Sequence, residues 1–348
     1  NAAWFLPRWA TPDQPAWAGS GPDGPVGATL TDGSQLVAGE VSGVPLPDTS
    51  APVVGALSAS YVRPGVVVHI TVSDTGSPRG GVGLACVMDG GAPAACTDGL
   101  ATAGLPAGHH HVHIAATDPS GNVTEADRTL TVDATPPTTA ALSLPAYTLT
   151  TSTTAVFSAA DSLSPLAYDL RYRSWPPSTV RPGGWAPTLT GLTSARRAIP
   201  VAAAGRTCMQ VRARDAAGNV GAWSVERCTT RPIDDRALRT LDAGWVRTSG
   251  SAFLSRTATQ TVRTGVRLVS LTGLSTRQVA VVATACPTCG AVSVWVAGIR
   301  VGTLNLRSSS TVARKIFVLP LGPARYGQLQ LRTLSSRLVR IDAVIPLR

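Results

Sequence analysis

The segment from Cys208 to Asp235 constrains the fold of this chain more than any other. Polar and apolar residues alternate over 209–213 and again over 220–225, and a Gly-Asn turn sequence lies between the two runs. Alternation with a period of two on both sides of a turn predicts two antiparallel strands joined by a tight loop. A cysteine stands near each outer end. The segment is therefore predicted to form a β-hairpin whose strands are joined by a disulfide.

The rest of the chain repeats this pattern and predicts an all-β protein of several modules. Its 348 residues include 34 Gly and 27 Pro, and they show short alternating runs without long helical periodicity. A chain of this length suffices for more than one domain, each with its own core. No run of about 18 apolar residues is present, so no transmembrane helix is predicted. Because the chain begins at Asn1 without a methionine, we expect a secreted product whose signal peptide has been removed.

The six cysteines fall into three close pairs, and each pair lies inside one candidate domain. Three local disulfides are therefore expected, and they suit an oxidising compartment. Zinc is the alternative, but only Cys286-Pro-Thr-Cys289 has ligand spacing. That spacing also resembles a redox motif, although both cysteines lie between predicted strands and not at a helix N-terminus. The expected pairs are Cys86 with Cys96, Cys208 with Cys228, and Cys286 with Cys289.

The predicted domains are an extended arm at 1–50 and β-sandwiches at 51–134, 135–232 and 233–348. The arm carries four large aromatic side chains among prolines and glycines, namely Trp4, Phe5, Trp9 and Trp17. A solvated linker seldom carries several tryptophans, because each exposes a large apolar surface unless it packs on something. We therefore expect the arm to dock, either on its own first domain or on a neighbouring molecule.

The first sandwich has the element order of the second half of an immunoglobulin-like domain. Its sequences CVMDGG and GHHHVHIAATDPSGN resemble the bacterial Ig-like repeats of secreted actinobacterial surface proteins. This resemblance covers most of the region and implies a module without implying an activity. The second sandwich resembles a fibronectin type III-like domain of the same secreted proteins, on the sequences YDLRYRSWPPS, LTGLT and VRARDAAGN in that order. The tyrosine that such domains often bury before the first cysteine is absent, because Gly-Arg-Thr precedes Cys208.

From Ile233 the strands become longer and alternate strictly, which is typical of a jelly-roll sandwich. The linker RCTTRPIDDR and the sequence VATACPTCGAV resemble the C-terminal β-sandwich of actinobacterial secreted proteins. These resemblances identify a pairing of domains and imply no particular activity for it.

Two patterns raise the question of a metal. His109, His111 and His113 would project from one face of a strand beside His110, and imidazole binds zinc or copper. We expect an ordinary surface strand, because the resembling repeats carry Gly-x-His at this place. The Asp-x-x-Gly-Asn loops at 118–122 and 215–219 raise a calcium hypothesis. We expect turn chemistry there, since Asp and Asn bond their own backbone and glycine takes the positive φ. No metal and no cofactor is predicted.

An enzyme is not predicted either. The sequence has no Gly-x-Ser-x-Gly, no His-Glu-x-x-His and no phosphate loop. Residues 171–348 contain no histidine, and adjacent carboxylates occur only at Asp234-Asp235, in a linker.

Charge is distributed unevenly along the chain. Residues 1–170 contain 4 Arg and 14 acidic residues, a formal balance of −10, whereas 171–348 contain 25 Arg, one Lys and 6 acidic residues, a balance of +20. Oppositely charged ends attract when two molecules meet head to tail. Each such contact leaves a free end for the next molecule, so the assembly grows unless the rotation between molecules closes it into a ring. Together with the aromatic arm, this predicts a non-enzymatic extracellular structural or surface protein that assembles with copies of itself into a filament or lattice.

The alternative is an adhesion protein that binds carbohydrate or a cell-wall polymer. Jelly-roll modules commonly bind glycans through exposed aromatic residues, and Trp245 and Trp295 are the candidates. Both lie in strand-like sequence, so we expect both in the core. Nucleic-acid binding by the basic half would rest on arginine alone, without interleaved aromatic residues or a known motif. For a secreted protein, teichoic acid or another wall polyanion is a more sensible partner than nucleic acid.

Overall fold

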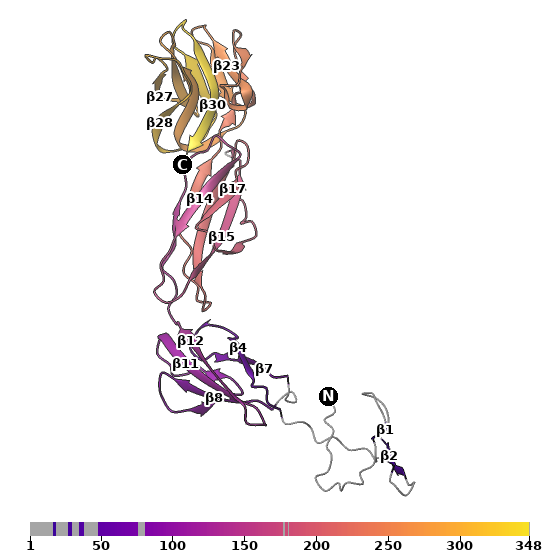
Figure 1. The fold of residues 1–348 in the computed structure, drawn as a ribbon. Coiled ribbons are helices and arrows are strands. Elements are labelled where there is room, and N and C mark those ends of the chain that lie inside the picture. Colours follow the sequence, from indigo (N-terminus) through magenta and orange to yellow (C-terminus); the bar gives the residue numbers. More distant parts are fainter. Residues whose placement is uncertain are drawn as a thin grey trace. The chain divides into compact units, whose positions relative to one another are not determined.

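A computed structural model describes residues 48–75, 81–176, 178–179 and 181–347, together with the backbone of three short strands further upstream (Figure 1). Those strands form an antiparallel sheet in the order β1 (Trp17–Ala18), β2 (Gly27–Thr29) and β3 (Gln35–Val37). The predicted docking residues Trp4, Phe5 and Trp9 lie outside the described residues, and so does the side chain of Trp17. The other described elements are strands and two 3-10 turns, so the prediction of an all-β protein is confirmed.

The first sandwich is built on a five-stranded sheet in the order β5-β12-β11-β8-β9, and β4-β7 and β10-β6 pair separately. In β11 every second side chain is buried, including Val112, Ile114 and Ala116, as expected for a half-buried strand. The strands are β4 (Val53–Leu57), β5 (Tyr61–Val62), β6 (Val67–Val68), β7 (Ile70–Ser73), β8 (Gly83–Met88), β9 (Ala94–Ala95), β10 (Leu100–Ala101), β11 (Gly108–Thr117) and β12 (Val123–Val132).

The chain divides into two compact units. The first comprises Asn1–Ser58, Val67–Leu100 and His111–Thr129, and the second comprises Ala59–Val66, Ala101–His110 and Leu130–Arg348. The second unit therefore contains both later sandwiches and the ends of the strands β11 and β12.

The second sandwich consists of a sheet β13-β14-β17 and a sheet β16-β15-β18-β19. Its core includes Phe157, Leu170, Ile199 and Val211, and the ring of Phe157 meets that of Tyr168 edge to face at 4.8 Å. The strands are β13 (Ala141–Ser143), β14 (Ser152–Ser158), β15 (Leu166–Trp175), β16 (Leu189–Leu192), β17 (Arg196–Pro200), β18 (Arg206–Asp215) and β19 (Arg227–Thr230).

The hairpin predicted over 208–235 differs from the structure in its second strand. Residues 221–225 were expected to be part of a strand and are not in one. The partner of β18 is instead β19, which places Cys208 opposite Cys228. The reason lies in Ser224. Its backbone N–H donates to the carbonyl of Val211 at 2.8 Å, while its side-chain Oγ accepts from the N–H of Val211 at 3.1 Å. A hydroxyl thus replaces a backbone carbonyl, and the ladder is interrupted before β19 begins.

The third sandwich pairs a sheet β22-β23-β30-β25-β28, to which β20 adds by pairing with β30, with a sheet β21-β24-β29-β26-β27. The strands are β20 (Ile233–Asp234), β21 (Leu238–Thr240), β22 (Val246–Ser249), β23 (Thr257–Thr261), β24 (Arg267–Ser270), β25 (Leu274–Ala285), β26 (Ala291–Val296), β27 (Ile299–Asn305), β28 (Val312–Gly327), β29 (Leu329–Thr333) and β30 (Val339–Leu347). The 3-10 turns are η1 (Asp235–Ala237) and η2 (Leu254–Arg256). Among the described residues no helix has the length and apolar character of a membrane span.

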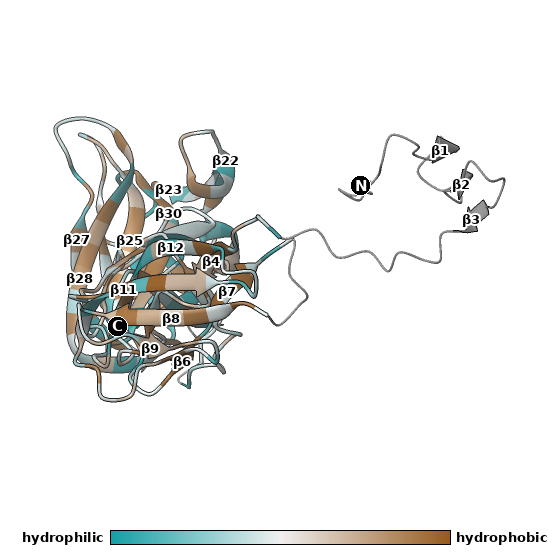
Figure 2. Ribbon diagram, turned by 60° about the horizontal axis from the view of Figure 1, so that its bottom comes forward, coloured by the Kyte–Doolittle hydropathy of each residue, from teal (hydrophilic) through white to brown (hydrophobic). Residues whose placement is uncertain are grey.

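The core of the third sandwich lies between its two sheets and includes Val281, Val294, Leu331 and Ile341. In Figure 2, apolar and polar segments alternate along many strands, as this two-faced packing requires. A second apolar cluster lies on the other face of β25 and β30, where Ala280, Val282 and Ile345 pack with Tyr147 and Leu149 of the preceding sandwich. The two sandwiches of the second unit therefore share buried apolar surface.

Candidate binding faces

A stack of alternating arginine and tryptophan side chains covers one face of the sheet β16-β15-β18-β19. In β15, Tyr168 and Leu170 belong to the core, so Asp169, Arg171 and Arg173 project to the opposite face. The antiparallel partner β18 places Arg212 opposite Asp169 and Gln210 opposite Arg171. We call this set the Arg–Trp stack; its members are Trp175, Arg173, Trp185, Arg171, Trp223 and Arg212.

Each guanidinium group of the stack lies over at least one indole ring. Arg171 lies 4.4 Å from the ring centroid of Trp185 and 4.3 Å from that of Trp223. Arg173 lies 4.4 Å from Trp185 and Arg212 lies 4.6 Å from Trp223. A cation over an indole face contributes roughly 0.5–2 kcal/mol, depending on its exposure to water. The stack therefore holds the three guanidinium groups in defined positions.

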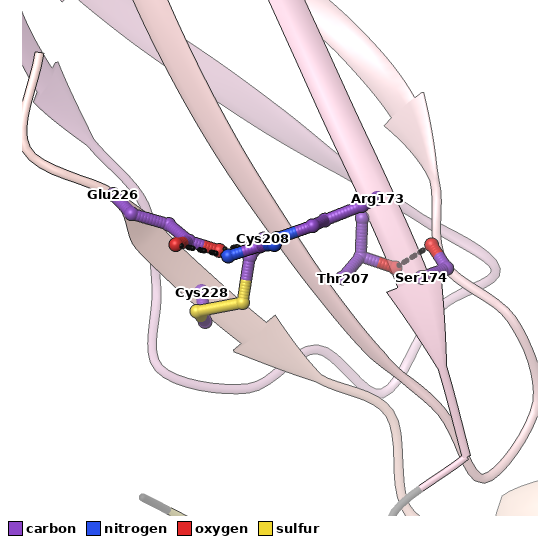
Figure 3. Close-up of a disulfide and its surroundings, with 6 residues drawn as sticks. All are labelled: Arg173, Ser174, Thr207, Cys208, Glu226 and Cys228. Carbon is purple, nitrogen blue, oxygen red and sulfur yellow. Dashed lines mark hydrogen bonds and ion pairs between the residues drawn. A yellow bond between two sulfur atoms is a disulfide. The ribbon is translucent and has the colours of Figure 1, made fainter. Parts of the chain in front are cut away.

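Hydrogen bonds and ion pairs with neighbouring side chains also hold the arginines of this face. Figure 3 shows Arg173 paired with Glu226 beside the Cys208–Cys228 disulfide, with Nε and Nη2 donating to the two carboxylate oxygens at 3.0 and 2.6 Å. Arg171 donates Nε and Nη2 to the amide oxygen of Gln210. Arg212 and Arg214 both pair with Asp169, whose side chain is only 1% exposed. A carboxylate this deeply buried requires such partners, because removing them leaves a buried charge.

Sequence inspection missed this stack, because its tryptophans are far apart in the chain. The arginines are visible at alternate positions in LRYRSW and VRARD, the pattern of an outward strand face. Trp185 and Trp223, however, come from segments outside the two central strands, and only the fold interleaves them with the arginines.

The second candidate face is the outer face of the sheet β21-β24-β29-β26-β27. Val292, Val294 and Val296 of β26 are fully buried in the core, so Ser293 and Trp295 project to the other side. In register, Trp295 lies between Gln330 of β29 and Arg300 of β27, and Ser293 lies between Arg332 and Thr303. The indole Nε1 of Trp295 donates to Ser293 Oγ at 3.1 Å, which fixes the ring orientation. Trp295 is thus a half-buried aromatic residue surrounded by polar side chains.

Trp245, the other tryptophan considered as a glycan contact, is in a different environment. It is partly buried and packs against the core cluster of the third sandwich. The expectation that both tryptophans lie in the core therefore fits Trp245 and differs from the structure for Trp295.

Three of the four histidines of β11 contact side chains of the neighbouring strand β12. His111 Nε2 and His113 Nδ1 lie 3.3 and 3.0 Å from the same oxygen of Asp127, and the hydrogen bond from His113 lowers the pKa of this carboxyl. His109 instead meets Thr131 Oγ1 at 2.8 Å, and the buried His110 meets the carbonyl of Pro106 at 2.9 Å. The structure brings two of the three aligned histidines to one carboxylate.

The two Asp-x-x-Gly-Asn loops have the same internal bonds. In the first, Asn122 donates its backbone N–H and its Nδ2 to the two oxygens of Asp118, and Asn219 does the same with Asp215 in the second. The Nδ2 of Asn122 also donates to the backbone carbonyl of Asp48, and the Nδ2 of Asn219 donates to that of Asp133. Both carbonyls lie before the first strands of the respective sandwiches. Each loop aspartate also lies close to two other carboxylates, which sequence inspection missed: Asp118 with Asp48 and Asp74, and Asp215 with Asp133 and Asp161.

Three disulfides join Cys86 to Cys96, Cys208 to Cys228 and Cys286 to Cys289. The last closes a short loop between β25 and β26, where Cys289 is buried and Pro287 is exposed. A shallow cavity lies beside this loop, lined by Pro287, Asn305, Arg307, Ser308 and Ser309.

No protein-family model matches the chain, and no curated protein matches it. Among solved structures it is similar to dimeric latent PorU from Porphyromonas gingivalis, with 13% identity and a TM-score of 0.22. The match covers 60% of this chain but only 24% of the PorU chain. It is similar to the FN1–FN3 domains of chicken CNTN1, with 9% identity and a TM-score of 0.26 over 86% of this chain and 98% of the other. A third structure comprises carbohydrate-binding modules of the β-sandwich superfamily, with 11% identity and a TM-score of 0.21 over 87% of this chain and 100% of the other. Likeness this low assigns no role to any residue of the chain.

Proposed function

We propose that this chain is a non-enzymatic, extracellular binding protein that holds carbohydrate on the outer face of the sheet β21-β24-β29-β26-β27. The observation that carries the proposal is the position of Trp295, a half-buried indole on the face of the sheet opposite to the core. A sugar presents an apolar face that stacks on an aromatic ring and hydroxyl groups that need polar partners. Gln330, Arg300 and Thr303 supply such partners around the ring. The three disulfides support an oxidising, extracellular location.

The test compares two tryptophans of the same sandwich. The measurement is native gel electrophoresis in gels that contain a neutral polysaccharide, where binding slows the migration of the native chain. Trp295→Ala is expected to stay folded and to migrate without this slowing. Gln330→Ala, which removes a polar neighbour without touching the aromatic ring, is expected to weaken retardation. Trp245→Ala is the control, since it should instead cost about 3–5 kcal/mol of stability. A folded Trp295→Ala variant that is retarded like the native chain would exclude this face.

Head-to-tail self-assembly is the second candidate, and the charge asymmetry of the sequence favours it. Residues 1–170 carry a balance of −10 and residues 171–348 a balance of +20, so the two halves attract between molecules. The contact would be heterologous and would therefore propagate into a filament or lattice. The aromatic residues Trp4, Phe5, Trp9 and Trp17 are the proposed docking points of the arm on a neighbour.

Light scattering after size-exclusion chromatography tests assembly at two salt concentrations. The mass is expected to exceed that of a monomer at 0.05 M salt and to fall at 1 M, where the Debye length shrinks to about 3 Å. A chain lacking residues 1–47 is expected to assemble less at both concentrations. If the complete chain remains a monomer at low salt and high concentration, self-assembly is excluded.

A further inference from the structure

The Arg–Trp stack leaves charge, and not aromatic surface, available to a ligand. Trp185 has Arg171 and Arg173 on its ring, and Trp223 has Arg171 and Arg212. The indole faces are therefore already used by guanidinium groups of the same module, and a sugar ring has little of them to stack on. This distinguishes the stack from the face around Trp295.

The face also carries an excess of positive charge. Four guanidinium groups, those of Arg171, Arg173, Arg212 and Arg214, share two carboxylates, Asp169 and Glu226. Asp169 is almost fully buried, so Glu226 is the more accessible of the two. Arg171 has a neutral amide, that of Gln210, as its hydrogen-bond acceptor. Its charge is therefore not matched by a carboxylate bonded to it.

We propose that this face binds a linear anionic polysaccharide, whose repeated oxyanion groups meet the row of guanidinium groups of Arg212, Arg171 and Arg173. Guanidinium groups bind carboxylate, sulfate and phosphate oxygens through charge-assisted hydrogen bonds. One indole separates each guanidinium group of the row from the next, so a small anion contacts only one of them. A polymer with repeated charges contacts several at once, and its affinity rises because the later contacts are intramolecular.

Preorganisation strengthens this interpretation. A free arginine side chain loses rotamer entropy when it binds an anion, whereas these arginines are already held between rings and by hydrogen bonds to Gln210, Asp169 and Glu226. Glu226 competes with an anionic ligand for Arg173, because its carboxylate already accepts hydrogen bonds from Nε and Nη2 of that arginine. The site is separate from the proposed carbohydrate face, since it lies in another sandwich and takes a ligand of different charge.

The experiment measures binding of the complete chain to dextran sulfate, with uncharged dextran as the reference polymer. Glu226→Gln is the informative variant, because glutamine keeps an acceptor for Arg173 but removes the competing charge. We expect it to bind dextran sulfate several-fold more tightly. Glu125→Gln, the same charge change at an exposed position of β12, is the matched control and should have a much smaller effect. A purely structural role of the Arg173–Glu226 pair predicts lower stability and no gain of binding.

The opposite change uses Arg171, which leaves no buried carboxylate behind when it is replaced. Arg171→Gln is expected to bind dextran sulfate about tenfold more weakly and with a smaller dependence on salt. Arg197→Gln, an exposed arginine of β17 in the other sheet of the same sandwich, is its control. Equal effects of Glu226→Gln and Glu125→Gln would overturn the proposal, because binding would then follow the overall charge of the chain. Retained binding in Trp295→Ala separates this site from the carbohydrate face.

Discussion

At the scale of single residues, Asp342 of β30 is an unusual ionisable group among the described residues. Its side chain is almost fully buried, and both carboxylate oxygens accept from the backbone N–H of Leu254 at 3.0 Å. Burial raises its pKa to about 6, and the nearby charges of Asp235 and Asp234 act in the same direction. The group is therefore a proton-binding site that forms only when the third sandwich folds.

This pKa predicts how stability depends on pH. A carboxyl whose pKa rises on folding binds its proton more tightly in the folded state. Its stabilising contribution is complete below the ordinary value of 3.8 and decreases as the pH rises to about 6. Asp342→Asn cannot ionise, so it should match the native chain at pH 4 and exceed its free energy of unfolding by roughly 1–3 kcal/mol at pH 7. Thermal unfolding at a series of pH values measures the difference.

Asp242→Asn is the control for this series. Its hydrogen bond from Arg267 lowers the pKa of Asp242 to about 2, so the carboxylate keeps its charge throughout pH 4–7. The difference between this variant and the native chain should therefore not change over that range. A chain with Asp342→Asn that is less stable than the native chain at pH 7 would contradict the role assigned to burial.

Trp245 and Trp295 show what residue patterns can and cannot predict. The run Val-Ser-Val-Trp-Val at 292–296 alternates strictly, so the valines in the core place Trp295 on the opposite face. The expectation of a core residue rested on the strand-like sequence and did not use this alternation to decide which face Trp295 occupies. No comparable pattern surrounds Trp245, whose packing against the core depends on how the segment before β22 folds over the sandwich.

At the scale of elements, a disulfide should stabilise more when it encloses a longer stretch of chain, and the gain rises only with the logarithm of that length. Cys208 and Cys228 are 20 residues apart, whereas Cys286 and Cys289 are 3 apart. Replacing both cysteines of the first pair with alanine is expected to cost about 3 kcal/mol, and replacing both of the second about half as much, because a shorter loop restricts the unfolded chain less. Denaturant unfolding measures both losses. Equal losses, or a crosslink between different sandwiches in a non-reduced peptide map, would contradict this assignment.

The β-hairpin at 208–235 shows where sequence reasoning succeeds and fails for an element. Alternation and the Gly-Asn turn predict the first strand and the turn, because both depend on neighbouring residues. The second strand was placed too early, over 220–225, because the hydroxyl of Ser224 bonds the backbone where a carbonyl was expected. A side chain that replaces a backbone group leaves no signal in a pattern of polar and apolar residues.

At the scale of the whole molecule, the all-β class could be predicted from turns and alternation, whereas contacts between distant segments could not. The apolar cluster of Tyr147 and Leu149 with β25 and β30 joins residues more than a hundred positions apart. In sequence these side chains are indistinguishable from those of an ordinary core. The Arg–Trp stack is hidden for the same reason, since its partners are brought together only by the fold.

The Cys208–Cys228 disulfide has a consequence for a molecule under tension. If the chain is pulled, force passes from β18 through the covalent bond to β19 and bypasses the residues between them. At about 3.4 Å per extended residue, the enclosed loop has a contour length on the order of 65 Å, and this length cannot extend while the disulfide is intact. Arg212, Trp223 and Glu226 all lie inside this shielded loop. Two members of the Arg–Trp stack, Arg212 and Trp223, and the Glu226 partner of Arg173 would therefore bear no load until the bond is reduced, even while neighbouring strands separate.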